Sequence, residues 1–127
     1  MKWVALLVFG ILGVFLRYIV SVYLQAKLAS SFPVSTLIIN TVGCFVIGVV
    51  YVCGVEKVAM PEELRLGLMV GLLGGFTTFS SYSLEVVNLL QASLWMQAGA
   101  YVLFSQVLGV GATGGAVVLT RFAFSFF

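Results

Sequence analysis

The chain has 127 residues, of which 62% are hydrophobic and only 8% are charged, and its mean hydropathy is +1.22. Soluble domains usually carry about a quarter charged residues, and a fold of this length has too little interior to bury so much apolar surface. The composition therefore excludes an ordinary soluble protein and predicts an all-α membrane protein that lies in lipid. A net charge of +2 is too small to indicate a nucleic-acid partner, and none is expected.

Residues that usually carry catalysis or bind metals are scarce. The chain contains no histidine, which removes the commonest general base. Its two cysteines, Cys44 and Cys53, lie nine residues apart in one apolar run, where they cannot pair with each other and do not make a metal site alone. No nucleophile–base pair is visible, so we do not expect an enzyme.

Four apolar runs are long enough to cross the roughly 30 Å hydrocarbon layer of a bilayer, which takes about 20 helical residues. The runs cover residues 3–24, 34–55, 66–96 and 98–120, and short connectors join them. The sequence therefore predicts a single four-span domain over residues 1–127. A cleaved signal peptide is an alternative for the first run, but the run is too long for that role and Arg17 divides it.

The charges between the runs say little about orientation. If all four runs cross, the lysine and arginine bias between the two sides is weak, because one side holds four of these residues and the other two. A weak bias permits insertion in both orientations without establishing it. The first side holds Lys2, Lys57, Arg65 and Arg121, and the second holds Lys27 with Arg17 nearby.

The third run is too long for one straight crossing, since a 31-residue helix would measure about 46 Å. Tilt absorbs part of the excess, but the paired glycines Gly74 and Gly75 weaken helix continuity and predict a break near residues 74–78. Non-helical backbone persists in a membrane only where protein buries it or a polar cavity meets it. Broken helices in transport proteins use free carbonyl groups for cations and free N–H groups for anions.

Polar side chains gather after the predicted break. Phe79, Tyr82 and Glu85 recur every three residues along one helix face, and an ionisable residue within a span is a functional candidate by default. Hydroxyl groups surround them, although serine and threonine also bond back to their own helix, and this structural role is the alternative. The hydroxyl residues are Thr77, Thr78, Ser80, Ser81 and Ser83.

The second and fourth runs supply further neutral donors. Asn40, within TLIINTVG, either forms a hydrogen bond that holds two helices together or donates to a permeating anion. Tyr101, Ser105 and Thr113 share one face of the fourth run. Gly109 occupies the position on this face between Ser105 and Thr113, where the series lacks a hydroxyl. Neutral donors and aromatic edges can replace the hydration of a small anion. The set favours small-anion permeation, and a cation or water path is almost as compatible.

Small residues recur four positions apart in two places, which lets helix backbones approach closely. Four helices enclose little room for an aqueous path, so a transport function favours an oligomer. The glycines serve either packing within the chain or a subunit interface. They are Gly67, Gly71 and Gly75 in the third run, and Gly111 and Gly115 in the fourth.

With GGFTTFSSYSLE in the third of four spans, TLIINTVG in the second and Arg17 near the end of the first, the whole chain resembles the Fluc (CrcB-type) fluoride channels. The resemblance implies a passive fluoride-selective channel in the bacterial inner membrane, which exports cytoplasmic fluoride and relieves its toxicity. It implies an antiparallel, dual-topology homodimer with two pores, in which the broken third helices cross near the membrane midplane. It also implies a central structural sodium ion (Na⁺), held by backbone carbonyl groups of Gly74 and Thr77 from both subunits.

The resemblance also assigns roles to individual residues. Asn40 matches the family's pore asparagine, and Phe79 matches the first of two aromatic residues that meet fluoride edge-on. Arg17 matches a basic residue near the vestibule, and the role of Glu85 is open between bonding the broken helix and assisting permeation. The expected fluoride pathway consists of Asn40, Thr78, Phe79, Ser81, Tyr82, Tyr101, Ser105 and Thr113.

Two positions depart from the family pattern. Tyr82 stands where the family has phenylalanine, and Gly109 stands where many relatives have a hydroxyl. A heterodimer with a paralogous subunit, or a channel with altered throughput, therefore stays open. The second hypothesis for function is a proton-coupled antiporter of the small multidrug-resistance type, but that chemistry needs a carboxylate in the first span, which offers Arg17 and no acid. The third hypothesis for function is a non-transporting membrane assembly factor, which applies if Asn40 and the hydroxyl groups serve only in packing.

Overall fold

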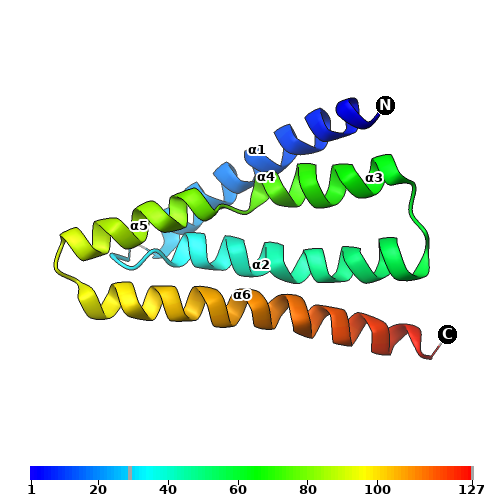
Figure 1. Cartoon of the computed structure of the whole chain (residues 1–127). Coiled ribbons are helices and arrows are strands. Elements are labelled where there is room, and N and C mark those ends of the chain that lie inside the picture. Colours follow the sequence, from blue (N-terminus) through cyan, green and yellow to red (C-terminus); the bar gives the residue numbers. More distant parts are fainter. Residues whose placement is uncertain (29, 127) are drawn as a thin grey trace.

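The computed structural model describes residues 1–28 and 30–126. Its successive spans alternate in direction along one long axis (Figure 1). Only Ala29 and Phe127 of the predicted 1–127 domain lie outside the described residues. Two segments are wider π-helical turns, which carry the symbol η. In chain order the segments are α1 (Lys2–Leu28), α2 (Val34–Tyr51), η1 (Val52–Lys57), α3 (Glu62–Leu66), η2 (Gly67–Leu73), α4 (Gly74–Phe76), α5 (Phe79–Gln91) and α6 (Trp95–Phe124).

These segments combine into four lengths that can cross a membrane. Within the described residues they are Lys2–Leu28, Val34–Lys57, Glu62–Gln91 and Trp95–Phe124. The third is the least hydrophobic of the four and carries the cluster of hydroxyl residues as well as Glu85. Both termini lie at the same end of the molecule, as an even number of crossings requires (Figure 1). The prediction of an all-α protein with four spans is confirmed.

The boundary between the third and fourth spans differs from the one that hydropathy indicates. The expected third run extends to residue 96, whereas α5 ends at Gln91 and α6 begins at Trp95. Ser93, between them, adopts a left-handed backbone with φ of 59°. Apolar residues resume directly after Ser93 as LWM, residues 94–96, so hydropathy does not detect the short turn.

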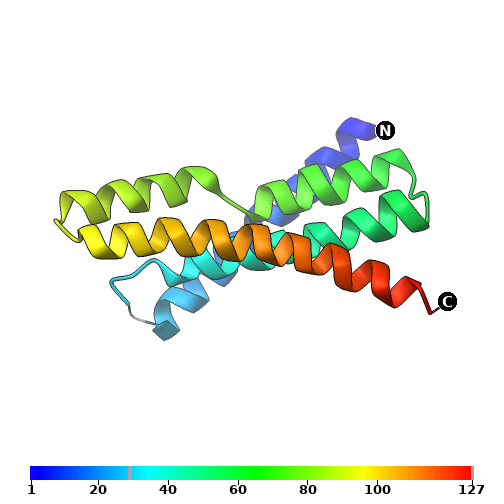
Figure 2. The same cartoon turned by 60° about the horizontal axis from the view of Figure 1, so that its bottom comes forward.

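The third span is interrupted near its middle, at Thr77 and Thr78, where an extended link joins α4 to α5 (Figure 2). Thr77 has φ of −83° and ψ of 161°, and Thr78 has φ of −149° and ψ of 125°. Gly74 and Gly75 themselves remain helical. The interruption therefore lies just beyond the glycine pair, at the end of the expected range 74–78, and the glycines do not make it.

Gly75 instead permits a close approach between helices. A Cβ atom at Gly75 would lie 2.9 Å from the carbonyl oxygen of Gly10, and one at Gly13 would overlap the backbone of Leu72. Both contacts join α1 to the third span, so each position requires a residue without a side chain. α1 packs chiefly on η2 and α4, and α2 packs chiefly on α6.

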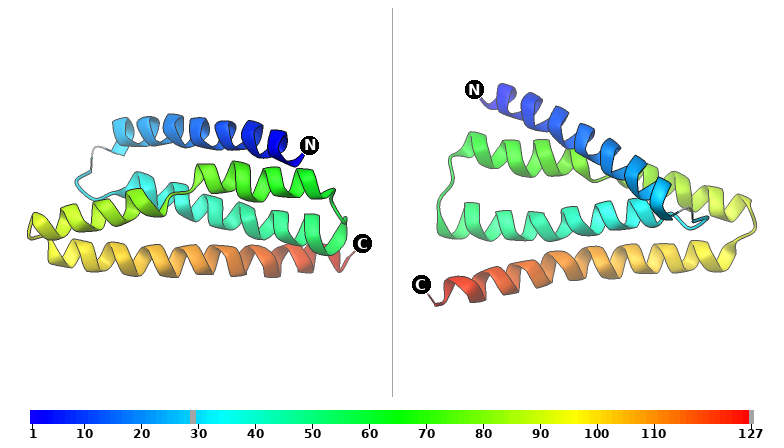
Figure 3. Two further views of the ribbon diagram at one scale, coloured as in Figure 1. Left: turned by 45° about the horizontal axis from the view of Figure 1, so that its top comes forward. Right: turned by 180° about the vertical axis from the view of Figure 1, so that it is seen from behind.

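α1 and α6 lie on opposite sides of the bundle (Figure 3). Gly67 and Gly71 face α1 in the same way as Gly75, so the glycine series of the third span packs within the chain. By contrast, nothing lies within 4 Å of a Cβ atom placed at Gly111 or Gly115. The glycine pair of α6 therefore faces away from the rest of the chain.

A small buried cluster lies between α5 and α6, and Phe32 packs against it from the first connector. Most apolar side chains of α1 face outward, and Gly13 is its only buried position among the described residues. An outward apolar surface is stable in lipid, which is as apolar as the side chains. The cluster consists of Tyr82, Leu89, Ala98 and Tyr101.

Candidate functional site

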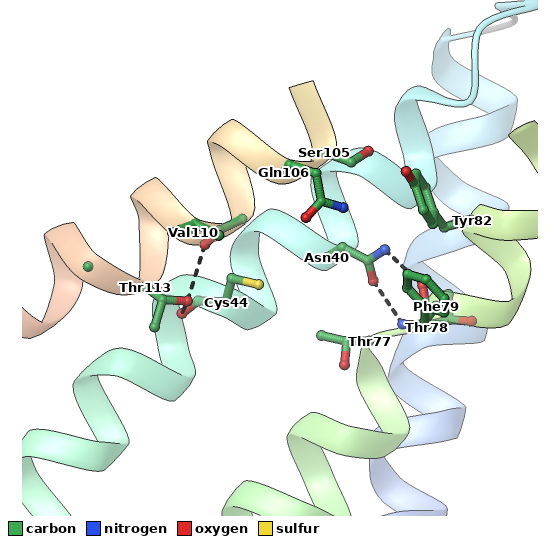
Figure 4. A pocket seen from close by; sticks show the side chains of 12 residues that line it. Asn40, Cys44, Thr77, Thr78, Phe79, Tyr82, Ser105, Gln106, Val110 and Thr113 are labelled. Carbon is green, nitrogen blue, oxygen red and sulfur yellow. Dashed lines mark hydrogen bonds between the residues drawn. The ribbon is translucent and has the colours of Figure 1, made fainter. Parts of the chain in front are cut away.

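The interrupted backbone is bridged by Asn40, which comes from α2. Asn40 Nδ2 donates to the carbonyl oxygen of Thr78 at 2.9 Å, and the main-chain N–H of Thr78 donates to Asn40 Oδ1 at 2.8 Å (Figure 4). The side-chain amide thus replaces peptide groups that a continuous helix would supply. An unpaired buried group of this kind costs about 1–3 kcal/mol, so the pairing makes the interruption tolerable. One N–H of the Asn40 amide remains for another acceptor.

The same hydrogen bonds release two main-chain carbonyl groups. In a continuous α-helix, the N–H of Thr78 would bond to Gly74 O and the N–H of Ser81 would bond to Thr77 O. The N–H of Thr78 bonds instead to Asn40, and the N–H of Ser81 donates at 3.2 Å to Thr78 Oγ1, which caps α5. The carbonyl groups of Gly74 and Thr77 thereby lose their helical donors. Neutral oxygens of this kind suit a hard cation.

An open groove of about 610 Å³ runs from the interruption between α2 and α6 (Figure 4). None of the residues that line it is charged, and its polar groups are hydroxyls, side-chain amides and a thiol. A cavity of this composition can solvate an ion through neutral dipoles. The lining residues are Asn40, Cys44, Thr77, Thr78, Phe79, Tyr82, Ser105, Gln106, Gly109, Val110, Thr113 and Gly114.

The hydroxyl groups of the groove differ in their availability. Thr113 Oγ1 donates to Cys44 O at 2.9 Å, with Gly109 O at 3.2 Å as a second acceptor. Thr77 Oγ1 donates to Leu73 O at 2.9 Å. Ser105 Oγ, in contrast, has no hydrogen-bond partner among the lining residues that Figure 4 draws. Ser105 is thus available to a bound species, whereas Thr113 must first give up a bond to the main chain.

Three of the predicted residues lie outside this groove, in a second pocket of about 320 Å³ on the α1 side of Thr78. Arg17, Ser81 and Glu85 line it. Arg17 Nε is buried without a hydrogen-bond partner among the described residues. The pocket therefore combines a cation, a carboxylate and hydroxyl groups. Its full lining is Val14, Arg17, Tyr18, Ser21, Gln25, Thr36, Ile39, Thr78, Ser81 and Glu85.

Glu85 connects three helices through its carboxylate. Thr36 Oγ1 on α2 donates to Glu85 Oε1 at 2.7 Å, and Tyr101 Oη on α6 donates to Glu85 Oε2 at 2.6 Å. Both donors are buried, Thr36 at 6% exposed and Tyr101 at 0%. Sequence reasoning did not single out Thr36, because a threonine in an apolar run is common and its partner lies 49 residues away. These bonds hold Glu85 in place beside the interrupted helix.

An aromatic row backs the groove. Phe79 and Tyr82 have ring centroids 5.5 Å apart, Tyr82 and Tyr101 lie 5.2 Å apart, and Phe32 meets Tyr101 edge-on at 5.4 Å. Phe79 is 74% exposed, so its ring stands at the surface of the chain. Tyr101 does not line the groove and lies behind Tyr82. The groove thus brings together the remaining predicted residues, Asn40, Thr78, Phe79, Tyr82, Ser105 and Thr113.

Comparison with known proteins identifies the family. The family model described as CrcB-like protein, Camphor Resistance (CrcB), matches residues 4–117. A relative from Roseiflexus sp. is 43% identical over 110 residues, which cover 87% of this chain and 89% of the relative. One from Saccharophagus degradans is 43% identical over 120 residues, covering 94% of this chain and 89% of the relative. One from Syntrophotalea carbinolica is 35% identical over 121 residues, covering 95% and 98%.

All three relatives are named as fluoride-specific ion channel FluC, which is a channel name and not that of an enzyme. The family model and the relatives extend over all four spans. The resemblance inferred from the sequence motifs is confirmed. This chain is a multi-pass membrane protein and belongs to the CrcB-like family.

Proposed function

We propose that this protein is a passive ion channel selective for fluoride. The observation that carries the proposal is the uncharged groove of hydrogen-bond donors beside the interrupted helix. Fluoride is small and strongly hydrated, so its passage requires close donors that replace water. Neutral dipoles do this at short range and attract larger anions less than a fixed positive charge would. The names of the relatives support the choice of fluoride.

The fluoride path runs along the groove. The free N–H of Asn40, the hydroxyl of Ser105 and the ring edges of Phe79 and Tyr82 are the groups that meet the ion, since an aromatic edge is electropositive. The hydroxyls of Thr78 and Thr113 lie along the groove, and that of Ser81 lies in the second pocket. Each exchanges its present bonds when fluoride arrives. Tyr101 supports the ring of Tyr82 from behind.

The second pocket serves as an entrance. The positive charge of Arg17 raises the local concentration of anions in this pocket. Glu85 does not bind the anion. It fixes α5 against its neighbours through its bonds to Thr36 and Tyr101.

Two copies assemble as an antiparallel dimer with dual topology and two pores, and the interrupted helices cross near the midplane. The groove is open on the surface of a single chain, and lipid would leave its unpaired hydrogen-bond donors unsatisfied, so a second copy covers it. The outward faces of Gly111 and Gly115 allow such a copy to approach closely. A heterodimer with a paralogous subunit is the alternative assembly.

A structural sodium ion lies between the two copies, bound by the carbonyl oxygens of Gly74 and Thr77 from each. The loss of the helical donors to these oxygens supports the site, because it leaves them free for a cation. No group of three histidine, cysteine or acidic side chains among the described residues could hold a metal ion, and the proposed ligands are main-chain oxygens. The ion would supply positive charge at the crossing of the two interrupted helices.

In a bacterial inner membrane such a channel lets accumulated fluoride leave the cytoplasm down its gradient, which relieves fluoride toxicity. A proton-coupled antiporter is the competing function. Liposomes that contain the purified protein and potassium fluoride separate the two. We expect fluoride release on addition of valinomycin, which carries the balancing charge, without a pH gradient. No fluoride release with valinomycin, together with transport of a cationic drug that requires a pH gradient, would favour the antiporter of the small multidrug-resistance type.

A further inference from the structure

The hydroxyl of Tyr82 lies in the groove without a partner. Tyr82 is only 8% exposed, so more than nine-tenths of the residue is buried, and it lines the groove. Among the lining residues drawn in Figure 4, none forms a hydrogen bond with its oxygen. In the part of the chain that the structure describes, Arg17 Nε and Gln97 Oε1 are the buried side-chain atoms left unpaired. Tyr82 Oη is therefore open to the groove and not sealed in protein.

Neighbouring aromatic rings restrict the orientation of the Tyr82 side chain and so fix the position of its hydroxyl. Phe79 packs on one side of the Tyr82 ring at 5.5 Å and Tyr101 on the other at 5.2 Å. Tyr101 is itself held by its bond to Glu85. The oxygen of Tyr82 points toward the end of the groove that holds Ser105 (Figure 4). Ser105 follows Tyr101 by one helical turn, so the two free hydroxyls share one stretch of the groove wall.

We propose that the Tyr82 hydroxyl donates a hydrogen bond to the anion in the groove and slows its departure. This inference rests on the proposed function. A ring edge alone, as in phenylalanine, attracts an anion weakly, whereas an O–H donor to an ionised acceptor forms a strong hydrogen bond. Conduction requires binding that is strong enough for entry and weak enough for exit. Tyr82 therefore makes this chain a channel that saturates at a lower fluoride concentration than its phenylalanine counterpart.

The test compares the full chain with Tyr82→Phe, which removes only the hydroxyl. The matched control is Tyr23→Phe, because Tyr23 is 61% exposed and lies on α1, outside the groove lining. We expect the fluoride concentration that half-saturates efflux from liposomes to rise at least about threefold in Tyr82→Phe, since one donor to the ion is lost. The maximal rate is expected to stay equal or increase. The Tyr23→Phe protein is expected to match the wild type in both.

A second measurement reads the hydroxyl directly. A phenol that donates to an anion changes its near-ultraviolet absorption, so fluoride added to the purified protein is expected to produce a tyrosine difference spectrum that an equal concentration of chloride does not. Tyr82→Phe is expected to abolish it, and Tyr23→Phe to retain it. A spectrum that persists in Tyr82→Phe, or a half-saturating concentration equal to that of the wild type, would overturn the inference.

The two proposals fail in different ways. Fluoride-selective efflux by the wild type without a Tyr82-dependent spectrum leaves the channel in place and removes the role of this hydroxyl. A Tyr82-dependent spectrum in a protein that moves no fluoride keeps the binding group and removes the channel.

Discussion

Asn40 and Thr78, which lie 38 residues apart, form a two-bond pair in which a side-chain amide takes the place of helical main chain. This pair fixes where the third span stops being a helix. It also sets the start of α5, because the extended Thr78 places its own hydroxyl to cap that helix. The groove, the released carbonyl groups and the orientation of Phe79 all follow from this arrangement.

The first prediction concerns the amide itself. Asn40→Ala leaves the N–H and C=O of Thr78 without partners, so we expect the free energy of unfolding to fall by about 1–3 kcal/mol. Hydrogen exchange at the Thr78 amide is expected to accelerate, since its acceptor is gone. Asn88→Ala, at an exposed asparagine of α5, is the control and is expected to change neither. Equal protection of Thr78 in the two variants would show that the pair does not hold the interruption.

The second prediction concerns the carboxylate that joins α2, α5 and α6. Thr36→Val and Tyr101→Phe each remove one donor to Glu85 and nearly preserve shape. Each is expected to lower the free energy of unfolding by about 1–3 kcal/mol, and the two effects are expected not to add, because both donors share one acceptor group. Thermal unfolding in detergent measures this.

Ser83→Ala is the control for these two variants. Its hydroxyl is bonded only to the carbonyl of Phe79 on its own helix, at 2.9 Å. If Thr36→Val and Tyr101→Phe unfold at the same temperature as Ser83→Ala, the carboxylate does not hold the helices together.

Sequence reasoning locates the spans because apolar runs of sufficient length are a local property. It places the interruption only within a range, since the residue that stabilises it, Asn40, comes from another helix. Of the glycine pair that suggests the break, both residues remain helical, and Gly75 serves a contact with α1 instead. That contact depends on how two spans pack against each other, and the local sequence of one span does not predict it.

The site follows the same rule. The motif around Phe79 identifies candidate residues, and the groove does gather six of the eight expected along the pathway. Sequence alone cannot separate Ser105, whose hydroxyl is free, from Thr113, whose hydroxyl is bonded to Cys44 O. It likewise places Tyr101 on the same helix face without showing that Tyr82 covers it. Both distinctions require the neighbouring helix.

A third prediction tests the close approach of α1 to the third span. Gly13→Ala places a methyl group into the backbone of Leu72, so we expect a loss of about 1–3 kcal/mol or more in the free energy of unfolding. Gly99→Ala, where nothing lies within 4 Å, is the matched change and is expected to be neutral or to stabilise by up to about 1 kcal/mol. Thermal unfolding of both in one detergent decides the matter, and a Gly13→Ala protein as stable as Gly99→Ala would refute the packing.

A fourth prediction concerns the connector between η1 and α3. Ala59 has a left-handed backbone with φ of 48°, which costs a residue with a side chain about 1–2 kcal/mol. Ala59→Gly is therefore expected to raise the free energy of unfolding by up to about 1 kcal/mol, after allowance for the greater freedom of glycine in the unfolded chain. Ala92→Gly, at φ of −78°, is the control and is expected to gain nothing. A lower unfolding temperature for Ala59→Gly would contradict the strained turn.

The central claim is that an uncharged groove beside an interrupted helix replaces the water around fluoride and does so poorly for larger halides. Its most direct measurement is parallel efflux of fluoride and chloride from liposomes that contain the purified chain, followed with selective electrodes. We predict fast fluoride release and chloride release no faster than from protein-free liposomes. Chloride release at the same rate as fluoride would contradict the claim.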